Sequence, residues 1–253
     1  MKTERVAKLM ASRGLCSRRE AERLIASGQV IVDGVVVRTQ GVKAAPDADI
    51  RVGAAGAAAL VAQVTVILNK PAGIVSTQPR PGEIPAWTLL RADTAAGDVA
   101  PETLARIVGA PSTLAVAGRL DRASRGLLVL TQDGTIARLL IGEHRVPKTY
   151  TVRVGEPVTD EQVRKLRGRM TLDGRPLRPM DVRRLSRHVL RFVLVEGRKH
   201  QIRRVCRTVG LTVVDLVRDA VGPLTLAGLP EGRWRAVGAE ETEQLKRFGD
   251  LVI

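Results

Sequence analysis

The feature that most constrains the fold is a short apolar run, Leu127–Leu130, with an arginine-rich loop directly before it. A run of this length without a polar residue predicts a buried strand. The loop contains Asp121, which is flanked by Arg119 and Arg122, and it follows Gly118, where the backbone can approach a ligand closely. An aspartate that is anchored by a core strand and surrounded by arginines can stay ionised beside a polyanion. The segment therefore predicts carboxylate chemistry, as a nucleophile or a base, on a nucleic acid.

Residues 1–60 carry the signals of a small separate domain. Ser17 and Glu20 have the spacing of a capping box, which predicts the start of a helix. The pair Asp33-Gly34 lies between two valine-rich runs and predicts a tight hairpin. The domain is therefore expected to combine helices with at least one hairpin.

The stretch after this domain is rich in alanine and glycine, and we interpret residues 53–59 as a linker, with a short helix as the alternative. Residues 61–253 are then a second domain. Within it, Lys148–Val154 alternates as a strand should, and Leu190–Val195 is a second strand. Strands that alternate with helices and hairpin-like turns predict an α+β fold with a mixed, mostly antiparallel sheet.

The balance of charges indicates a polyanionic partner. The chain has 41 Lys and Arg residues against 26 Asp and Glu residues, a formal net charge of +15, and most of the basic residues are arginines. Because arginine favours bidentate contacts to phosphate, nucleic acid is the first partner class, and an anionic membrane surface is the second. A codon bias toward arginine does not by itself explain this excess of positive charge.

Metal and membrane functions find little support in the sequence. Cys16 and Cys206 lie far apart, and with 3 His residues they form neither a metal pattern nor a disulfide framework. No apolar run reaches the length of about 18 residues that a membrane-spanning helix needs, and the N-terminus lacks a signal-peptide core. We expect a soluble, cytoplasmic, monomeric protein without a metal site.

A dense basic segment lies between residues 183 and 207, with Glu196 as its single acid. Each phosphate that such a segment neutralises releases counterions, which predicts strong, salt-sensitive binding to nucleic acid. Aromatic residues are scarce, so rows of stacking platforms for single strands are not expected. The basic residues of the segment are Arg183, Arg184, Arg187, Arg191, Arg198, Lys199, Arg203, Arg204 and Arg207.

Two segments of the first domain, Arg5–Leu9 and Ser17–Gly34, together resemble an S4 RNA-binding domain. The resemblance implies binding to structured RNA through the capped helix and the turn that follows it. The basic residues expected to contact RNA in this domain are Arg13, Arg18, Arg19 and Arg23.

Four blocks of the second domain are similar to the pseudouridine synthases that carry an S4 domain and modify ribosomal RNA. They are Leu68–Gly73, Gly118–Gly134, Lys148–Tyr150, and Glu196–Val205 with its continuation to Arg218. Their order and spacing carry the resemblance, which spans nearly the whole chain. It implies isomerisation of uridine to pseudouridine in ribosomal RNA or in ribosomal assembly intermediates, without a cofactor.

The resemblance also implies roles for single residues. Asp121 is the expected catalytic carboxylate, which attacks the sugar, attacks the base or abstracts a sugar proton; the sequence leaves all three routes open. Arg203 is its expected ion partner, with Arg204 as the fallback, and Tyr150 is expected to stack on the uracil. Arg119 either fills the gap of the flipped base or contacts a phosphate. The other residues expected to bind RNA are Arg122, Arg198, Lys199 and Arg204.

Two alternative functions make different demands on the sequence. A non-catalytic RNA-binding protein that assists ribosome assembly would share the S4 domain and the basic surface. An RNA methyltransferase would need a glycine-rich loop after its first strand, and Pro71 with the single glycine of that block argues against one. The histidines His144, His188 and His200 are interpreted as surface or RNA-contact residues, and Lys70 as a structural or substrate-positioning group.

Overall fold

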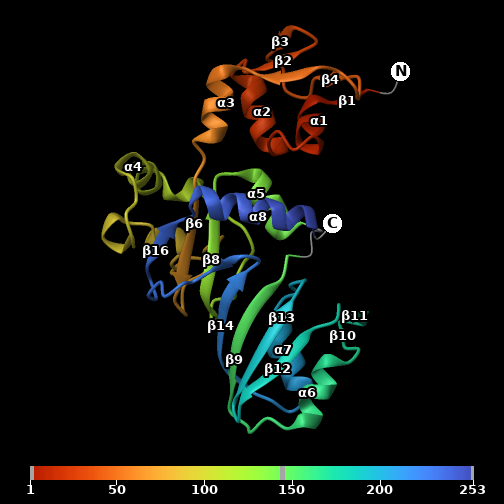
Figure 1. The fold of residues 1–253 in the computed structure, drawn as a ribbon, viewed down its shortest axis with the longest axis vertical. Coiled ribbons are helices and arrows are strands. Elements are labelled where there is room, and N and C mark those ends of the chain that lie inside the picture. Colours follow the sequence, from red (N-terminus) through yellow and green to blue (C-terminus); the bar gives the residue numbers. More distant parts are fainter. Residues whose placement is uncertain (1–2, 143–145, 252–253) are drawn as a thin grey trace.

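The computed structural model describes residues 3–142 and 146–251. The N-terminal part of the chain lies at one end of the long axis of the molecule, above the larger sheet-containing part (Figure 1). Its elements are β1 (Glu4–Arg5), α1 (Val6–Ser12), α2 (Arg18–Ala26), β2 (Val30–Val32), β3 (Val35–Val37), β4 (Lys43–Ala44), β5 (Ile50–Val52) and α3 (Ala54–Val61).

Local sequence signals explain the elements of the N-terminal part. The capping box at α2 is confirmed, because the side chain of Ser17 accepts a hydrogen bond from the Glu20 amide and the Glu20 carboxylate accepts one from the Ser17 amide. The hairpin of β2 and β3 is confirmed as well, with positive φ angles of 49° at Asp33 and 82° at Gly34. Two positive φ angles in a row are what a tight two-residue hairpin turn requires.

The linker predicted at residues 53–59 is wrong, since this stretch forms helix α3. Alanine has the strongest intrinsic preference for a helix, and here the helix also packs against its neighbours. The side chain of Gln29 accepts a hydrogen bond from the Gly56 amide at 3.0 Å. A Cβ atom at Gly56 would lie 2.8 Å from the side chain of Val52 and 3.0 Å from that of Leu24. The helix is thus part of the N-terminal core and not a flexible tether.

The second part of the chain is built on a nine-stranded sheet with the order β12-β13-β9-β14-β8-β6-β16, to which β7 and β15 add at β8 and β14. Among the strands that the structure describes, β14 and β8 form the one parallel pair, so the predicted mixed and mostly antiparallel α+β fold is confirmed. The strands are β6 (Thr65–Lys70), β7 (Ala115–Val116), β8 (Arg125–Thr131), β9 (Lys148–Val154), β12 (Asp181–Ser186), β13 (Val189–Leu194), β14 (Val213–Val221), β15 (Leu224–Thr225) and β16 (Trp234–Ala236).

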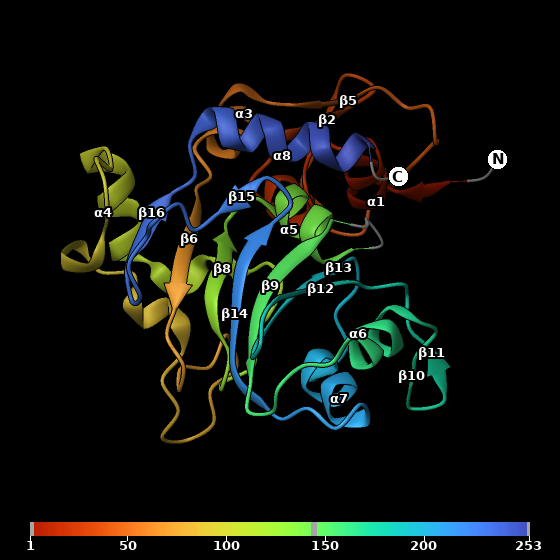
Figure 2. The ribbon, with the colours of Figure 1, turned by 60° about the horizontal axis from the view of Figure 1, so that its bottom comes forward.

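The central strand β8 is buried on both faces, as its apolar run predicts. Leu128 and Leu130 belong to the core on one face, and Leu127 and Val129 belong to the core on the other. The first face is covered partly by α6 (Asp160–Arg167) and α7 (Gln201–Thr208), and the second by α5 (Gly134–Ile141) and α8 (Ala239–Leu251), as Figures 1 and 2 show.

The remaining elements are short. A small hairpin, β10 (Thr171–Leu172) and β11 (Arg175–Pro176), lies beside α6 at the end of the molecule opposite to the N-terminal part (Figure 1). The segment between β6 and β8 holds the 3-10 helices η1 (Ala86–Leu89), η2 (Ala92–Thr94) and η3 (Pro111–Thr113) and the helix α4 (Pro101–Gly109). Among the described residues, no helix is both long and apolar enough to span a membrane.

Candidate active site

A cavity of about 980 Å³ opens where the loop before β8 meets the start of α7. The three predicted catalytic residues, Asp121, Tyr150 and Arg203, all line it. Four of the predicted RNA-binding residues also line it: Arg119, Arg122, Arg198 and Lys199. The structure thus brings together residues from three of the four sequence blocks, which lie up to 84 positions apart, from Arg119 to Arg203.

The backbone on both sides of Asp121 is held by hydrogen bonds. The buried hydroxyl of Ser76 donates to the carbonyl oxygen of Leu120 at 2.6 Å and accepts from the Leu120 amide at 2.9 Å. On the other side, the amide of Gly73 donates to the carbonyl oxygen of Arg122 at 2.8 Å. The loop between β6 and η1 therefore clamps the residues before and after Asp121, which holds the backbone from which its side chain projects into the cavity.

A buried guanidinium on the neighbouring strand β14 supports the same loop. Arg218, on β14, is 2% exposed and donates to the carbonyl oxygens of Leu127 at 2.8 Å, Gly118 at 2.9 Å and Arg119 at 3.4 Å. β14 approaches β8 so closely that a Cβ atom at Gly126 would lie 2.7 Å from the backbone nitrogen of Arg218. Arg218 was not singled out from the sequence, although it ends the last of the four blocks.

The predicted ion pair between Asp121 and Arg203 is wrong. In the part of the chain that the structure describes, the Asp121 carboxylate instead pairs with His200, whose Nε2 atom lies 3.5 Å from Oδ1. Arg203 donates to the carbonyl oxygens of Ala123 at 3.0 Å and of Val213 at 3.1 Å. Its guanidinium is used to tie the Asp121 loop to β14, so Arg203 positions the loop and does not contact the carboxylate.

From the sequence, His200 is expected to be a surface or RNA-contact residue. In the structure it lies beside Asp121 at the cavity. It precedes α7 and adopts a left-handed conformation with φ of 53°, which is uncommon for a residue other than glycine. The side chains of His200 and Asp121 are 49% and 37% exposed, so the pair is open to solvent and to a ligand. His144, interpreted in the same way, lies outside the described residues.

Tyr150 lies on the central part of β9, opposite Phe192 on one neighbouring strand and Arg218 on the other. It is 9% exposed and borders the cavity. Lys148 lies two residues earlier on the same strand face and borders the cavity too. Burial and the nearby charge of Arg218 lower the pKa of Lys148 to about 8. A lysine in this position was not predicted as a site residue.

Lys70 is buried beneath the loop that clamps Asp121. Its Nζ atom donates to the carbonyl oxygens of Pro71 at 2.7 Å and Ile74 at 2.8 Å. Burial lowers the pKa of Lys70 to about 8, with the Arg218 charge acting in the same direction and the carboxylates of Glu231 and Asp121 against it. These contacts give Lys70 a structural role in the loop that holds the Asp121 backbone.

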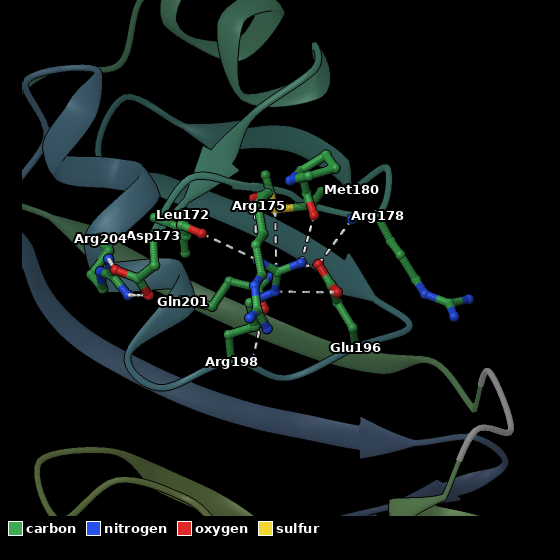
Figure 3. Close-up of polar contacts among 10 residues, drawn as sticks. Leu172, Asp173, Arg175, Arg178, Met180, Glu196, Arg198, Gln201 and Arg204 are labelled. Carbon is green, nitrogen blue, oxygen red and sulfur yellow. Dashed lines mark hydrogen bonds and ion pairs between the residues drawn. The ribbon is translucent and has the colours of Figure 1, made fainter.

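Two of the predicted RNA-binding arginines are used inside the protein (Figure 3). Arg198 donates to the carbonyl oxygens of Leu172 at 3.3 Å and Arg175 at 3.2 Å. Arg204 makes two hydrogen bonds to the carboxylate of Asp173, at 2.6 and 2.9 Å. The two side chains therefore fasten the hairpin β10–β11 to α7 and to the segment just before it. Arg204 is not among the residues that line the cavity.

The other predicted RNA-binding residues differ in whether their side chains are paired with other groups of the protein. Arg18, Arg19 and Arg23 are exposed on α2, and none of them forms an ion pair with another described residue. Arg119 and Lys199 are exposed at the cavity, also without an ion pair inside the described ranges. Two other guanidinium groups are held inside the protein. That of Arg13 donates to the carbonyl oxygens of Pro46 and Ala48, and that of Arg122 donates to the carbonyl oxygen of Gly73 and lies 3.7 Å from Glu83.

Metal ligands do not gather in the described part of the chain. No group of three or more His, Cys, Asp or Glu side chains there could hold a metal ion. Burial raises the pKa of Cys16 to about 11 and that of Cys206 to about 12, which keeps both as thiols.

Comparison with known proteins agrees with this geometry. A model of the RNA pseudouridylate synthase family matches residues 64–208, and an S4 domain model matches residues 4–50. An uncharacterised RNA pseudouridine synthase of Aquifex aeolicus is 31% identical over 95% of this chain and 93% of its own length. The dual-specificity RNA pseudouridine synthase RluF of Shigella flexneri is 31% identical over 94% of this chain and 76% of its own length.

The fold agrees as well. A crystal structure of a pseudouridylate synthase superimposes with a TM-score of 0.64 over 95% of this chain and 99% of that one, at 24% sequence identity. Family models cover both parts of the chain, and the full-length relatives extend across both of them. The chain therefore belongs to the RNA pseudouridine synthase family and carries an S4 domain ahead of its synthase domain.

Proposed function

We propose that this enzyme converts uridine to pseudouridine in ribosomal RNA, with Asp121 as the catalytic carboxylate. The observation that carries the proposal is that Asp121 and Tyr150 border one cavity of about 980 Å³. Binding sites for small molecules have volumes of about 300–1,000 Å³, so the cavity has room for a nucleotide turned out of its stack. Its walls offer a carboxylate, a ring for the base and cations for the phosphates.

The reaction conserves every atom of the nucleotide. The bond from the ribose C1′ to uracil N1 breaks, the base turns, and a bond from C1′ to C5 forms. The proton on C5 is lost and N1 gains one, so no electron donor or group donor enters. Asp121 can serve by attacking C1′, by attacking the base or by removing a sugar proton, and each route needs its ionised form. The Nε2 atom of His200 lies 3.5 Å from that carboxylate, within reach of an ion pair when the ring carries a proton.

The cations around the cavity support an RNA substrate. Arg119 and Lys199 are exposed beside Asp121, and Lys148 lies deeper, next to Tyr150. In the described ranges no group accepts a hydrogen bond from the Lys148 amine, which leaves the amine able to contact a bound phosphate. Partial burial of a cation costs stability, and an anionic substrate offsets that cost.

We further propose that residues 1–60 act as the RNA-binding domain and residues 61–253 as the catalytic domain. In support, the buried residues Val6 to Ile50 form one hydrophobic cluster, and the clusters of the sheet begin at Val64. The exposed Arg18, Arg19 and Arg23 on α2 suit phosphate contacts. We also propose that the enzyme is a monomer that acts in the cytoplasm. Its substrate there would be ribosomal RNA, either free or in an assembly intermediate.

The experiment is to map pseudouridine in the ribosomal RNA of a strain that lacks the gene, and of the same strain with the gene restored. We expect one or a few positions to lose pseudouridine and to regain it. An assembly factor without activity would leave every position modified while it alters the maturation of the subunits. An unchanged map would therefore overturn the proposed function.

A further inference from the structure

The two domains meet where two helices begin side by side. α5, which directly follows β8, lies between the S4 domain and the central sheet in both views (Figures 1 and 2). Its first residue, Gly134, donates its amide hydrogen to Oε1 of Glu20 on α2 at 3.2 Å. The other carboxylate oxygen of Glu20 accepts from the Ser17 amide at 2.6 Å. The side chain of Glu20 thus accepts a backbone hydrogen bond at the N-terminal end of one helix in each domain.

The environment of Glu20 suits this double role. The residue is 3% exposed and also accepts a hydrogen bond from the side chain of Gln63, in the segment that joins the domains. Burial raises the pKa of Glu20, but the hydrogen bonds from Ser17, Gln63 and Gly134 outweigh burial and leave it below its ordinary value. The carboxylate is therefore ionised at neutral pH, and both helix starts favour a negative charge.

Gly134 is required for this contact. A Cβ atom there would overlap with Cβ and Oγ of Ser17 and would lie 2.7 Å from Oε2 of Glu20. A second contact lies one turn further along α5, where Arg138 donates to the carbonyl oxygen of Ala11 at 3.1 Å. The S4 domain is thus held at two points of the same helix, α5.

Helix α5 is in turn tied to the catalytic loop. β8 connects the Asp121 loop at one end to α5 at the other, and its seven residues span about 23 Å at roughly 3.3 Å per residue. The strand is buried on both faces, so it does not bend freely. The direction of the S4 domain relative to Asp121 therefore depends on the contact between Glu20 and Gly134.

We propose that the contact of Glu20 with Gly134 sets the position of the S4 domain and thereby selects which uridine of a structured RNA reaches Asp121. The proposal rests on the proposed function and names two positioning residues for it. When the S4 domain is held at a fixed distance, RNA bound there presents its target at a high effective concentration. When the domain is released, that advantage falls, while the chemistry at Asp121 is unchanged.

The test uses Gly134→Ala in the full chain. Alanine is well tolerated in the first turn of a helix, so α5 itself should form, but the new methyl group separates the two domains. The matched control is Gly109→Ala at the end of α4, where an added Cβ meets no atom within 4 Å. Ser17→Gly in the Gly134→Ala background removes the two nearest overlapping atoms, Cβ and Oγ of Ser17, and keeps an accepted helix N-cap, so it should rescue the docking.

The first readout is the distance between spin labels at two exposed positions, Val35→Cys in the S4 domain and Leu185→Cys on β12. The native Cys16 and Cys206 are buried and should not be labelled. We expect one narrow distance distribution for the parent protein and for Gly109→Ala, a broad one for Gly134→Ala, and a narrow one again after Ser17→Gly. A distribution that stays narrow in Gly134→Ala would overturn the proposal.

The second readout is the kinetics of pseudouridine formation on two RNAs, the full-length ribosomal RNA transcript and a short synthetic stem-loop with the target uridine. For Gly134→Ala on the transcript we expect KM to rise about tenfold with an unchanged kcat, and no change on the stem-loop. Released domains with an unchanged KM on the transcript, or an equal loss on both RNAs, would contradict the proposal. If the parent protein modifies neither RNA, the proposed function fails, whereas the label distances still report whether Glu20 and Gly134 dock the domain.

Discussion

The Nε2 atom of His200 lies 3.5 Å from Oδ1 of Asp121, in a pair that is open to the cavity on one side. We expect His200→Gln to lower kcat about three- to tenfold, because a neutral amide orients the carboxylate less strongly than a ring that can be protonated. The free energy of unfolding should change by less than about 0.5 kcal/mol, as is usual for exposed pairs. Steady-state kinetics and urea unfolding check both statements, and an unchanged kcat would contradict the positioning role.

The partial burial of the Lys148 amine lowers the stability of the folded protein. Its pKa is about 8 in the folded protein against an ordinary value of 10.5, so the folded state disfavours its charge. The unfolded chain binds more protons between these values, and stability therefore rises with pH there. The penalty is fully present below about pH 8 and disappears toward pH 10.5.

We therefore expect Lys148→Met to raise the free energy of unfolding at pH 7 by about 1–2 kcal/mol. The difference from the parent protein should shrink as the pH rises above 8, while activity on RNA falls at every pH. Thermal unfolding of both proteins between pH 6.5 and 9.5 checks this. A variant that is less stable at pH 7 would show that the lysine is compensated inside the protein.

Arg218 supports the catalytic loop through hydrogen bonds to three backbone carbonyl oxygens. Arg218→Met leaves the carbonyl groups of Leu127, Gly118 and Arg119 without its hydrogen bonds, and each buried unsatisfied group costs about 1–3 kcal/mol. We expect a loss of about 3 kcal/mol in urea unfolding and loss of activity. Arg153→Met, at an exposed position on β9, is the control and should stay within about 0.5 kcal/mol. Equal stability of both variants would contradict the support role.

Lys199 and Arg204 should respond differently to salt. Lys199 is exposed at the cavity, whereas the charge of Arg204 is already met by Asp173 at 2.6 Å. We expect Lys199→Ala to weaken RNA binding and to reduce the slope of log affinity against log salt by about 1. Arg204→Ala should leave that slope unchanged. Filter binding of ribosomal RNA across a salt series separates the two cases, and an equal change of slope would indicate that Arg204 contacts phosphate directly.

Elements set by local signals could be predicted well. The capping box at Ser17, the hairpin turn at Asp33 and the buried strand after Asp121 each depend on neighbours within a few residues. The linker at residues 53–59 was misinterpreted because small residues suggest flexibility when their packing is unknown. Gly56 is buried against Val52 and Leu24, and no local pattern reveals that contact.

In the candidate site, too, features with a sequence motif could be predicted, and features that depend on contacts between distant segments could not. Family motifs predicted that Asp121 and Tyr150 would meet, and the structure places both at one cavity. Arg218 lies opposite Tyr150 only because β9 pairs with β14. The two residues are 68 positions apart in the sequence, so no local pattern predicts that they meet. The partner of Asp121 likewise depended on where α7 begins: His200, just before α7, reaches the carboxylate, and Arg203 reaches the backbone instead.

The central claim is that the carboxylate of Asp121 carries the reaction. Asp121→Asn keeps the size of the side chain and removes its charge, and Asn is a poor nucleophile and a poor base. The direct measurement is the release of tritium from ribosomal RNA labelled at C5 of uridine, by purified parent and variant proteins, with RNA affinity measured in parallel. We predict a loss of rate of at least about 10³-fold with unchanged RNA affinity. Tritium release by Asp121→Asn at the parent rate would contradict the account.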